Sequence, residues 1–77
     1  MKVNCQICRY YTVQVEIPDE FRKLAKPLLE PNENTKEEFE RCIKAVENAT
    51  GLPFSDDYDE FVVEVESAEN GETMLEL

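Results

Sequence analysis

Residues 61–77 read FVVEVESAENGETMLEL, and apolar and charged residues alternate on both sides of Asn70-Gly71. A period of two is typical of a β-strand with one buried face, and Asn-Gly is a strong hairpin signal. A two-residue turn at this point would set Val65 opposite Glu76 and so place a charge on the core face. A three-residue loop that ends at the glycine pairs Val65 with Leu75 instead, and this is the register we predict.

The same register predicts a hairpin face that is rich in carboxylates. It sets Glu64 opposite Glu76, Glu66 opposite Met74, and Glu72 beside Ala68. Like charges directly across a strand pair destabilise a sheet. We therefore expect this face to lie in water or against a partner, away from the core.

Upstream of the hairpin, residues 35–50 have the pattern of an amphipathic helix. Thr35 and Glu38 form a capping box, in which each side chain accepts a hydrogen bond from an unpaired amide of the first turn. One apolar stripe follows at helical spacing: Phe39, Cys42, Ile43, Val46 and Ala49. Gly51 and Pro53 predict that the helix ends at residue 50.

Residues 3–17 also alternate, with Val3, Cys5, Ile7, Tyr11, Val13, Val15 and Ile17 on one parity. A strand of this length would extend about 50 Å at roughly 3.3 Å per residue, too long for so short a chain. Arg9 also interrupts the apolar parity. We therefore expect a bend, bulge or frayed start near residues 8–9 and a reliable strand at residues 10–17.

Pro18 ends this strand, and apolar residues at helical spacing over residues 21–28 predict a short helix that Pro27 kinks. The predicted order is therefore β-α-α-β-β. We expect an α+β fold in which two helices pack on one face of an antiparallel sheet of about three strands. With 77 residues the chain forms a single small domain, residues 1–77, because no second core can be built.

The charge of the chain is unevenly distributed. The formal net charge is −10, from 18 acidic and 8 basic residues with no histidine. Residues 1–44 hold 8 basic and 8 acidic residues, whereas residues 45–77 hold 10 acidic residues and no basic one. The acidic residues of the second part therefore have no counterions nearby in the sequence.

A surface of one sign favours a basic partner, because complementary potentials speed association and set specificity. Nucleic-acid-binding proteins are rich in such basic surfaces, whereas nucleic acid itself would be repelled. We therefore expect a non-enzymatic module that inhibits a basic nucleic-acid-binding protein by charge mimicry. Phage anti-defence inhibitors, anti-CRISPR and anti-restriction proteins among them, use this mode as a class. The candidate contact residues are Asp56, Asp57, Asp59, Glu60, Glu64, Glu66, Glu72, Glu76 and Tyr10.

Two alternatives remain open at this point. The acidic residues can serve solubility alone, since charged faces and edges guard against aggregation. The chain can also be a small structural or assembly protein, a homodimer that associates through a free strand edge without any inhibitory role.

The cysteines have C-x-x-C spacing at Cys5 and Cys8, but residues three apart on a strand point to opposite faces. We therefore expect a core thiol at Cys5, a surface thiol at Cys8 and a buried thiol at Cys42, with a metal or redox site as the weaker interpretation. The acidic residues 56–60 lack the spacing and the glycine of an EF-hand calcium loop.

No catalytic residues, cofactor or metal are expected. The absence of histidine excludes Ser-His-Asp triads, and so short a chain rarely encloses a deep pocket. The sequence contains no run of about 18 apolar residues and no leader-like segment after Met1. We therefore expect a soluble cytoplasmic protein that does not bind a membrane.

Overall fold

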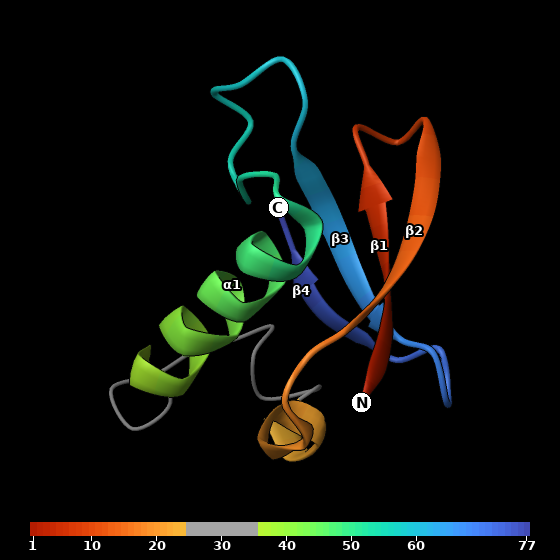
Figure 1. The fold of residues 1–77 in the computed structure, drawn as a ribbon, viewed down its shortest axis with the longest axis vertical. Helices are drawn as coiled ribbons and strands as arrows, with labels where there is room; N and C mark the ends of the chain where they lie inside the picture. Colours follow the sequence, from red (N-terminus) through yellow and green to blue (C-terminus); the bar gives the residue numbers. More distant parts are fainter. Residues whose placement is uncertain (25–35) are drawn as a thin grey trace.

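The computed structural model describes residues 1–24 and 36–77. In these residues a four-stranded antiparallel sheet is crossed on one side by one α-helix (Figure 1). The strands are β1 (Lys2–Ile7), β2 (Tyr11–Glu16), β3 (Val62–Ser67) and β4 (Thr73–Glu76), in the spatial order β2-β1-β3-β4. A 3-10 helix, η1 (Asp19–Leu24), follows β2, and the helix α1 (Lys36–Thr50) precedes β3. The predicted α+β class with an antiparallel sheet is confirmed.

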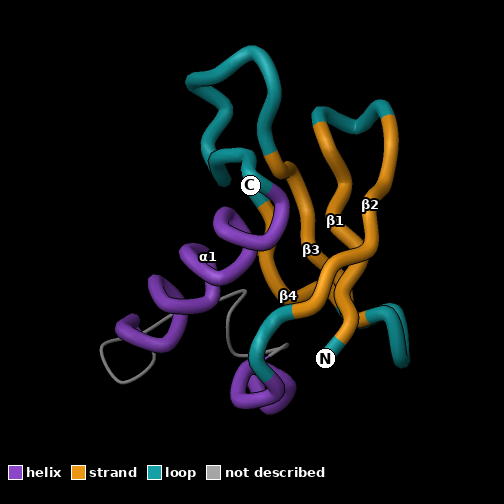
Figure 2. The backbone as a smooth tube through the Cα atoms, in the orientation of Figure 1, coloured by secondary structure: helices purple, strands orange, loops and turns teal. Residues whose placement is uncertain are grey.

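The prediction of one bent strand over residues 3–17 is wrong, because this stretch is the β1–β2 hairpin (Figure 2). Its turn holds Cys8 at a φ of 50° and Arg9 at a φ of 64°, and the Tyr10 N–H donates to the Ile7 carbonyl at 2.9 Å. Ile7 pairs with Tyr11, so the odd residues stay on one face through the turn and the alternation is not interrupted. Left-handed turns usually carry glycine or asparagine, and neither is present here. The sheet therefore has four strands, not about three.

The prediction of two helices is also corrected. Residues 19–24 form the six-residue 3-10 helix η1, and the remainder of the predicted first helix, with Pro27, lies outside the described residues. The second predicted helix is confirmed as α1, whereas Thr35 of its predicted capping box lies outside the described residues. Residues 1–24 and 36–77 thus contain one α-helix.

The end of α1 follows the prediction. Gly51 adopts a φ of 72°, and its N–H donates to the Glu47 carbonyl at 2.8 Å. The Thr50 hydroxyl donates to the Val46 carbonyl at 2.9 Å. The Gly51 bond satisfies a carbonyl of the last helical turn that has no partner within the helix.

The core lies between α1 and the sheet. Its buried members include Val3, Cys5, Ile7, Phe21, Cys42, Val46, Val62, Val65, Met74 and Leu75. Two predicted core positions are wrong. Ala49 is exposed, and Ala45 packs against the core from α1 instead. Tyr11 is 47% exposed, because it lies at the end of the edge strand β2.

The β3–β4 hairpin has the predicted register near its open end. Glu64 pairs with Glu76, and Val65 pairs with Leu75. Gly71 has the expected left-handed φ of 73°. The predicted three-residue loop is wrong, because the Ser67 N–H donates to the Glu72 carbonyl at 2.8 Å, so Glu72 lies opposite Ser67 instead of Ala68 and residues 68–71 form the loop. The expected pairing of Glu66 with Met74 is wrong, because Glu66 pairs with Thr73 across a β-bulge. The bulge lets Met74 enter the core, where it is fully buried.

Candidate functional site

The first candidate surface is the side of the sheet opposite α1, here called the open face. Strand pairing places its side chains in two rows across all four strands. The first row is Gln14, Asn4, Glu66 and Thr73, and the second is Thr12, Gln6, Glu64 and Glu76. On β1, β2 and β3 these residues share the parity opposite to the core positions, since successive side chains of a strand alternate between faces. On β4 the bulge puts Thr73 in a row with Glu66 and Glu76 in a row with Glu64, although the two residues differ in parity.

The middle of the open face is slightly hollow. Asn4, Gln6, Thr12, Glu64 and Glu66 line a shallow depression of about 220 Å³. The carboxylates and the amide and hydroxyl oxygens of these residues can all accept hydrogen bonds. The depression therefore suits a cationic or hydrogen-donating group.

The carboxylates of the open face lack cationic partners. Within the described part of the chain, no Lys or Arg side chain forms an ion pair with Glu64, Glu66 or Glu76. The Thr73 hydroxyl donates to Glu64 at 3.5 Å, a weak contact. Lys2 also lies on the sheet, on β1 next to β3, where it pairs with Glu16 of β2. The open face therefore has a local excess of negative charge over β3 and β4.

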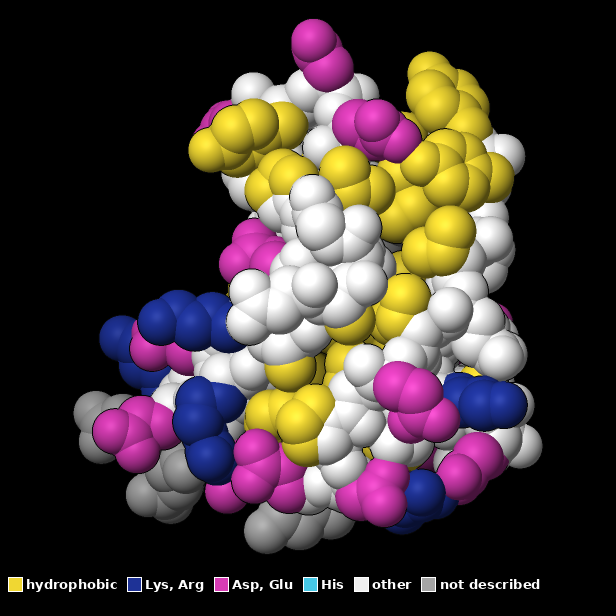
Figure 3. Space-filling view, in the orientation of Figure 1, with side chains coloured by type: hydrophobic (Ala, Val, Ile, Leu, Met, Phe, Trp, Pro, Cys, Tyr) yellow, Lys and Arg dark blue, Asp and Glu magenta, His cyan; other side chains and the backbone are white. Residues whose placement is uncertain are grey.

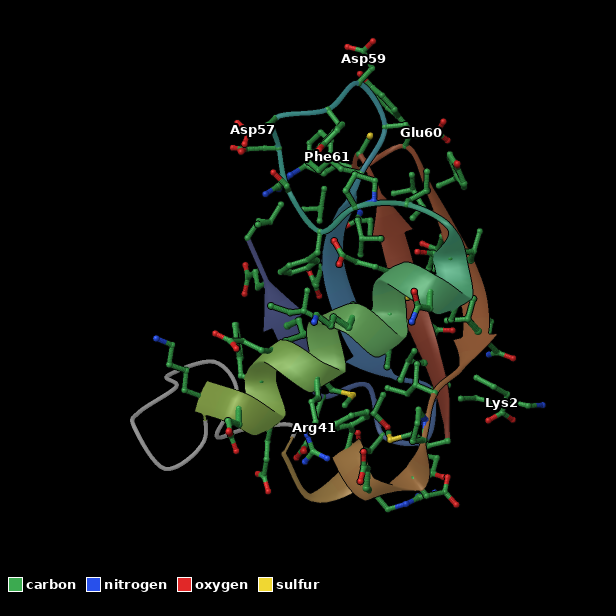
Figure 4. The ribbon with its side chains drawn as sticks, turned by 60° about the vertical axis from the view of Figure 1, so that its left-hand side comes forward. Lys2, Arg41, Asp57, Asp59, Glu60 and Phe61 are labelled. Carbon is green, nitrogen blue, oxygen red and sulfur yellow. The ribbon has the colours of Figure 1, made fainter. Side chains whose placement is uncertain are left out.

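The second candidate surface is the end of the molecule where loop 51–61 meets the β1–β2 turn, here called the tip. Figure 4 shows Asp57, Asp59 and Glu60 at this end, with Lys2 and Arg41 toward the other end. Asp56 belongs to the same loop, and it lines a small hollow together with Arg9 of the β1–β2 turn. The tip thus gathers four acidic residues that follow one another closely in the sequence.

Hydrogen bonds between loop 51–61 and the β1–β2 hairpin hold the tip together. The Cys8 N–H donates to the Phe61 carbonyl at 3.0 Å, and the Phe61 N–H donates to the Cys8 sulfur at 3.3 Å. The Tyr11 hydroxyl donates to the Glu60 carboxylate. This bond raises the pKa of Tyr11, because it stabilises the neutral phenol, and partial burial and the Glu60 charge act in the same direction.

Exposed aromatic rings accompany the acidic residues of the tip. Tyr10 is 87% exposed and Tyr58 is 61% exposed. Figure 3 shows hydrophobic and acidic side chains interspersed at this end of the molecule. Tyrosine is enriched in protein interfaces because it combines a large apolar ring with a hydrogen-bonding group.

The nine candidate contact residues therefore lie in three places. Asp56, Asp57, Asp59, Glu60 and Tyr10 are at the tip, and Glu64, Glu66 and Glu76 are on the open face. Glu72 lies in the β3–β4 turn at the opposite end, where its carbonyl accepts the Ser67 N–H at 2.8 Å. Near it, Glu69 forms an ion pair with Arg22.

Sequence reasoning missed the amide and hydroxyl residues of the open face, namely Asn4, Gln6, Thr12 and Gln14. Their signal was present, because they occupy the even positions opposite the apolar parity of residues 3–17. Their position beside Glu64 and Glu66 depends on β1 pairing with β3, which are far apart in the sequence.

The cysteines lie in separate environments. Cys5 and Cys42 are buried, and Cys8 is partly exposed at the tip. Burial raises the pKa of Cys5 to about 11 and that of Cys42 to about 12. In residues 1–24 and 36–77, no three Cys, Asp or Glu side chains are grouped so as to hold a metal ion. None of the helices in these two segments has the length and apolar character needed to cross a membrane.

In comparisons with protein-family models, curated proteins and solved structures, nothing matches this chain.

Proposed function

We propose that this protein is a non-enzymatic acidic module that docks its open face on the basic surface of a nucleic-acid-binding protein and inhibits it by charge mimicry. The observation that carries the proposal is the Glu64–Glu76 pair beside Glu66, on a sheet face that no described helix covers. An inhibitor of this kind needs no catalytic group, only a surface that competes for the partner's lysines and arginines.

Electrostatic complementarity supports this docking mode. Paired Glu64 and Glu76 repel one another in the free protein, and a cationic partner removes that repulsion on binding. Carboxylates also accept two parallel hydrogen bonds from an arginine, which fixes its orientation. The neighbouring oxygens of Asn4 and Gln6 can accept further hydrogen bonds from the same partner.

The tip supplies a second contact in this proposal. Tyr10 and Tyr58 offer aromatic faces that attract lysine and arginine side chains, and the adjacent carboxylates add charge. A partner that spans the tip and the open face would contact eight of the nine candidate residues, leaving Glu72 outside the interface. We further propose a cytoplasmic location, because free thiols such as Cys5 and Cys42 are common where disulfides are kept reduced.

Binding to a panel of purified basic nucleic-acid-binding proteins, repeated across NaCl concentrations, tests the proposal. We expect affinity to fall as salt rises, and DNA to compete for the same partner. A variant with Glu64, Glu66 and Glu76 changed to Gln should lose about tenfold or more in affinity, since each interfacial charge pair is worth upwards of 1 kcal/mol.

The matched control changes Glu37, Glu38 and Glu40 of α1 to Gln, which removes the same charge from another side of the molecule. This variant should keep most of the affinity. Binding that ignores salt, or that survives the open-face variant unchanged, would contradict the proposal.

Self-association through a strand edge is the second candidate, and the outer edge of β2, with which no strand of residues 1–24 and 36–77 pairs, favours it. Light scattering coupled to size-exclusion chromatography separates the two functions. A stable dimer that buries the open face would rule out inhibition by that face, whereas a monomer at all salt concentrations would rule out the assembly role.

A further inference from the structure

The two edge strands of the sheet differ in how open they are. β4 has only four residues and a bulge between its pairs with Val65 and Glu66. β2 has six residues, contains no proline or lysine, and pairs with β1 in continuous register. Short length, bulges, proline and lysine are the usual features that keep an edge from pairing with another chain. β2 lacks all of them.

The backbone of β2 presents a regular row of hydrogen-bonding groups on its outer side. The mutual bonds between Met1 and Ile17, at 2.7 and 3.0 Å, show that odd residues of β2 bond to β1. In an antiparallel pair the residues between them direct their N–H and C=O groups away from the partner strand. The outward groups of β2 therefore belong to Thr12, Gln14 and Glu16, all of which are exposed.

The side chains of β2 define what a neighbouring strand would meet on each face. Thr12, Gln14 and Glu16 stand on the open face, and no lysine or arginine belongs to the strand. On the side of α1, Val13 and Val15 are only half-buried although they pack against the core. Figure 3 shows hydrophobic surface between α1 and β2 on this side.

We infer that β2 is the docking edge for an extended segment of the basic partner, which adds to the sheet as a fifth strand. Apolar residues at alternate positions of that segment would cover Val13 and Val15, and lysine or arginine at the positions between would lie on the open face. This inference rests on the proposed function, and it adds backbone hydrogen bonds and a sequence pattern to it.

Charge selects a basic segment over a second copy of this chain. The formal net charge of −10 attracts a cationic strand and repels another copy. Glu16 at this edge already pairs with the Met1 ammonium at 3.3 Å and lies opposite Lys2, so among the described residues the nearest carboxylates without a cationic partner are Glu64 and Glu66, two strands further along the open face. A single pair of six-residue strands also buries far less than the roughly 1,200 Å² of a stable interface. Attraction between opposite charges therefore has to supply part of the binding free energy.

Three synthetic nine-residue peptides serve as the probe. The first alternates valine and lysine, the second has the same composition in scrambled order, and the third alternates valine and glutamate. Binding is followed by the ¹⁵N-resolved amide signals of the full chain and by their hydrogen exchange. We expect only the first peptide to protect the Thr12, Gln14 and Glu16 amides, because only it matches both faces of β2.

Gln14→Pro is the decisive variant, since it removes an outward N–H and leaves the backbone bonds to β1 intact. The side-chain bond from Gln14 to Asn4 is lost in this variant and equally in the control Gln14→Thr. It should weaken binding of the valine–lysine peptide about tenfold. Gln14→Thr keeps the N–H and should bind as the natural chain does. If Gln14→Pro fails to fold, Thr12→Lys tests the same edge, because it repels the peptide and should weaken binding by a similar factor.

The outcomes separate this inference from the proposed function. Equal binding of the scrambled peptide would overturn the inference that β2 is the docking edge, while leaving charge-based docking intact. Shifts of the Glu64 and Glu66 amide signals without protection of the β2 amides would have the same meaning. Protection of the same amides by a second copy at high protein concentration, without peptide, would also overturn it. Protection of the β2 amides that persists when Glu64, Glu66 and Glu76 are changed to Gln would support docking at the β2 edge. It would also contradict the proposal that the open-face carboxylates bind the partner.

Discussion

At Glu76 a neutral residue would favour the stability of the fold, whereas the proposed function favours a carboxylate. Glu76 pairs directly with Glu64 on the open face, and within the described residues neither side chain has a cationic partner. A polar, uncharged residue would serve the hairpin better, because like charges across a strand pair cost stability. The proposed function accounts for this pair, since a partner would need both carboxylates.

Glu76→Gln should therefore stabilise the free protein. We expect an increase of about 0.5 kcal/mol in the free energy of unfolding, which is the scale of a cross-strand charge interaction. Urea unfolding at low salt measures this change. Glu40→Gln on α1 is the control, because it removes one charge without a carboxylate directly opposite. Equal effects of the two substitutions would show that Glu64 and Glu76 do not repel one another.

At the scale of elements, the predictability of the fold depended on the turns. The β3–β4 register could be predicted near its open end, because Asn70-Gly71 marks the turn and only one register keeps Val65 with Leu75. The bulge that pairs Glu66 with Thr73 could not be predicted. The β1–β2 turn could not be predicted, because Cys8 and Arg9 take left-handed conformations that are unusual for these residue types. Tertiary contacts with Phe61 hold that turn in place, and no local pattern reports them.

The candidate site was predictable to the same extent. The acidic residues of loop 51–61 and of β3 could be identified from charge alone. Their division between the tip and the open face could not, because it depends on β1 lying between β2 and β3. Asn4 and Gln6 lie beside Glu66 and Glu64 for the same reason, because β1 pairs with β3.

The contact between β2 and loop 51–61 gives a prediction at the element scale. The hydrogen bond to Glu60 raises the pKa of Tyr11 above its ordinary value of 10.0. A raised pKa in the folded state means that this contact stabilises the tip below pH 10 and is lost as the pH rises through the folded value. Glu60→Gln should lower the pKa of Tyr11 toward 10, as measured by phenolate absorbance with Tyr11→Phe to assign the signal.

Asp57→Asn provides the control for this titration. Asp57 belongs to the same loop, and its carboxylate accepts a hydrogen bond from Ser55, not from Tyr11. The pKa of Tyr11 should stay raised in this variant. If both substitutions lower it equally, the general charge of the loop is responsible and the specific bond to Glu60 is not.

At the scale of the whole molecule, excess negative charge is confined to a small volume. The described chain extends 32 × 26 × 18 Å, so many of its carboxylates lie within one or two Debye lengths of one another at ordinary ionic strength. Ion pairs offset part of this repulsion, including Met1 with Glu16 and Arg41 with Glu20. Exposed pairs contribute only about 0–1 kcal/mol each, so they leave most of the excess uncompensated.

Added NaCl should therefore stabilise this protein. Raising NaCl from low concentration to about 0.5 M screens the repulsion, and we expect Tm to rise by roughly 4–8 °C, the shift that about 1 kcal/mol produces in a domain of this size. The two triple variants locate the source of the effect, since each removes three negative charges. If repulsion is concentrated on the open face, changing Glu64, Glu66 and Glu76 to Gln will flatten the salt response, and changing Glu37, Glu38 and Glu40 to Gln will leave it nearly intact. Equal flattening in both variants would mean that net charge alone sets the response, and the open face would then carry no special excess for a partner to recognise.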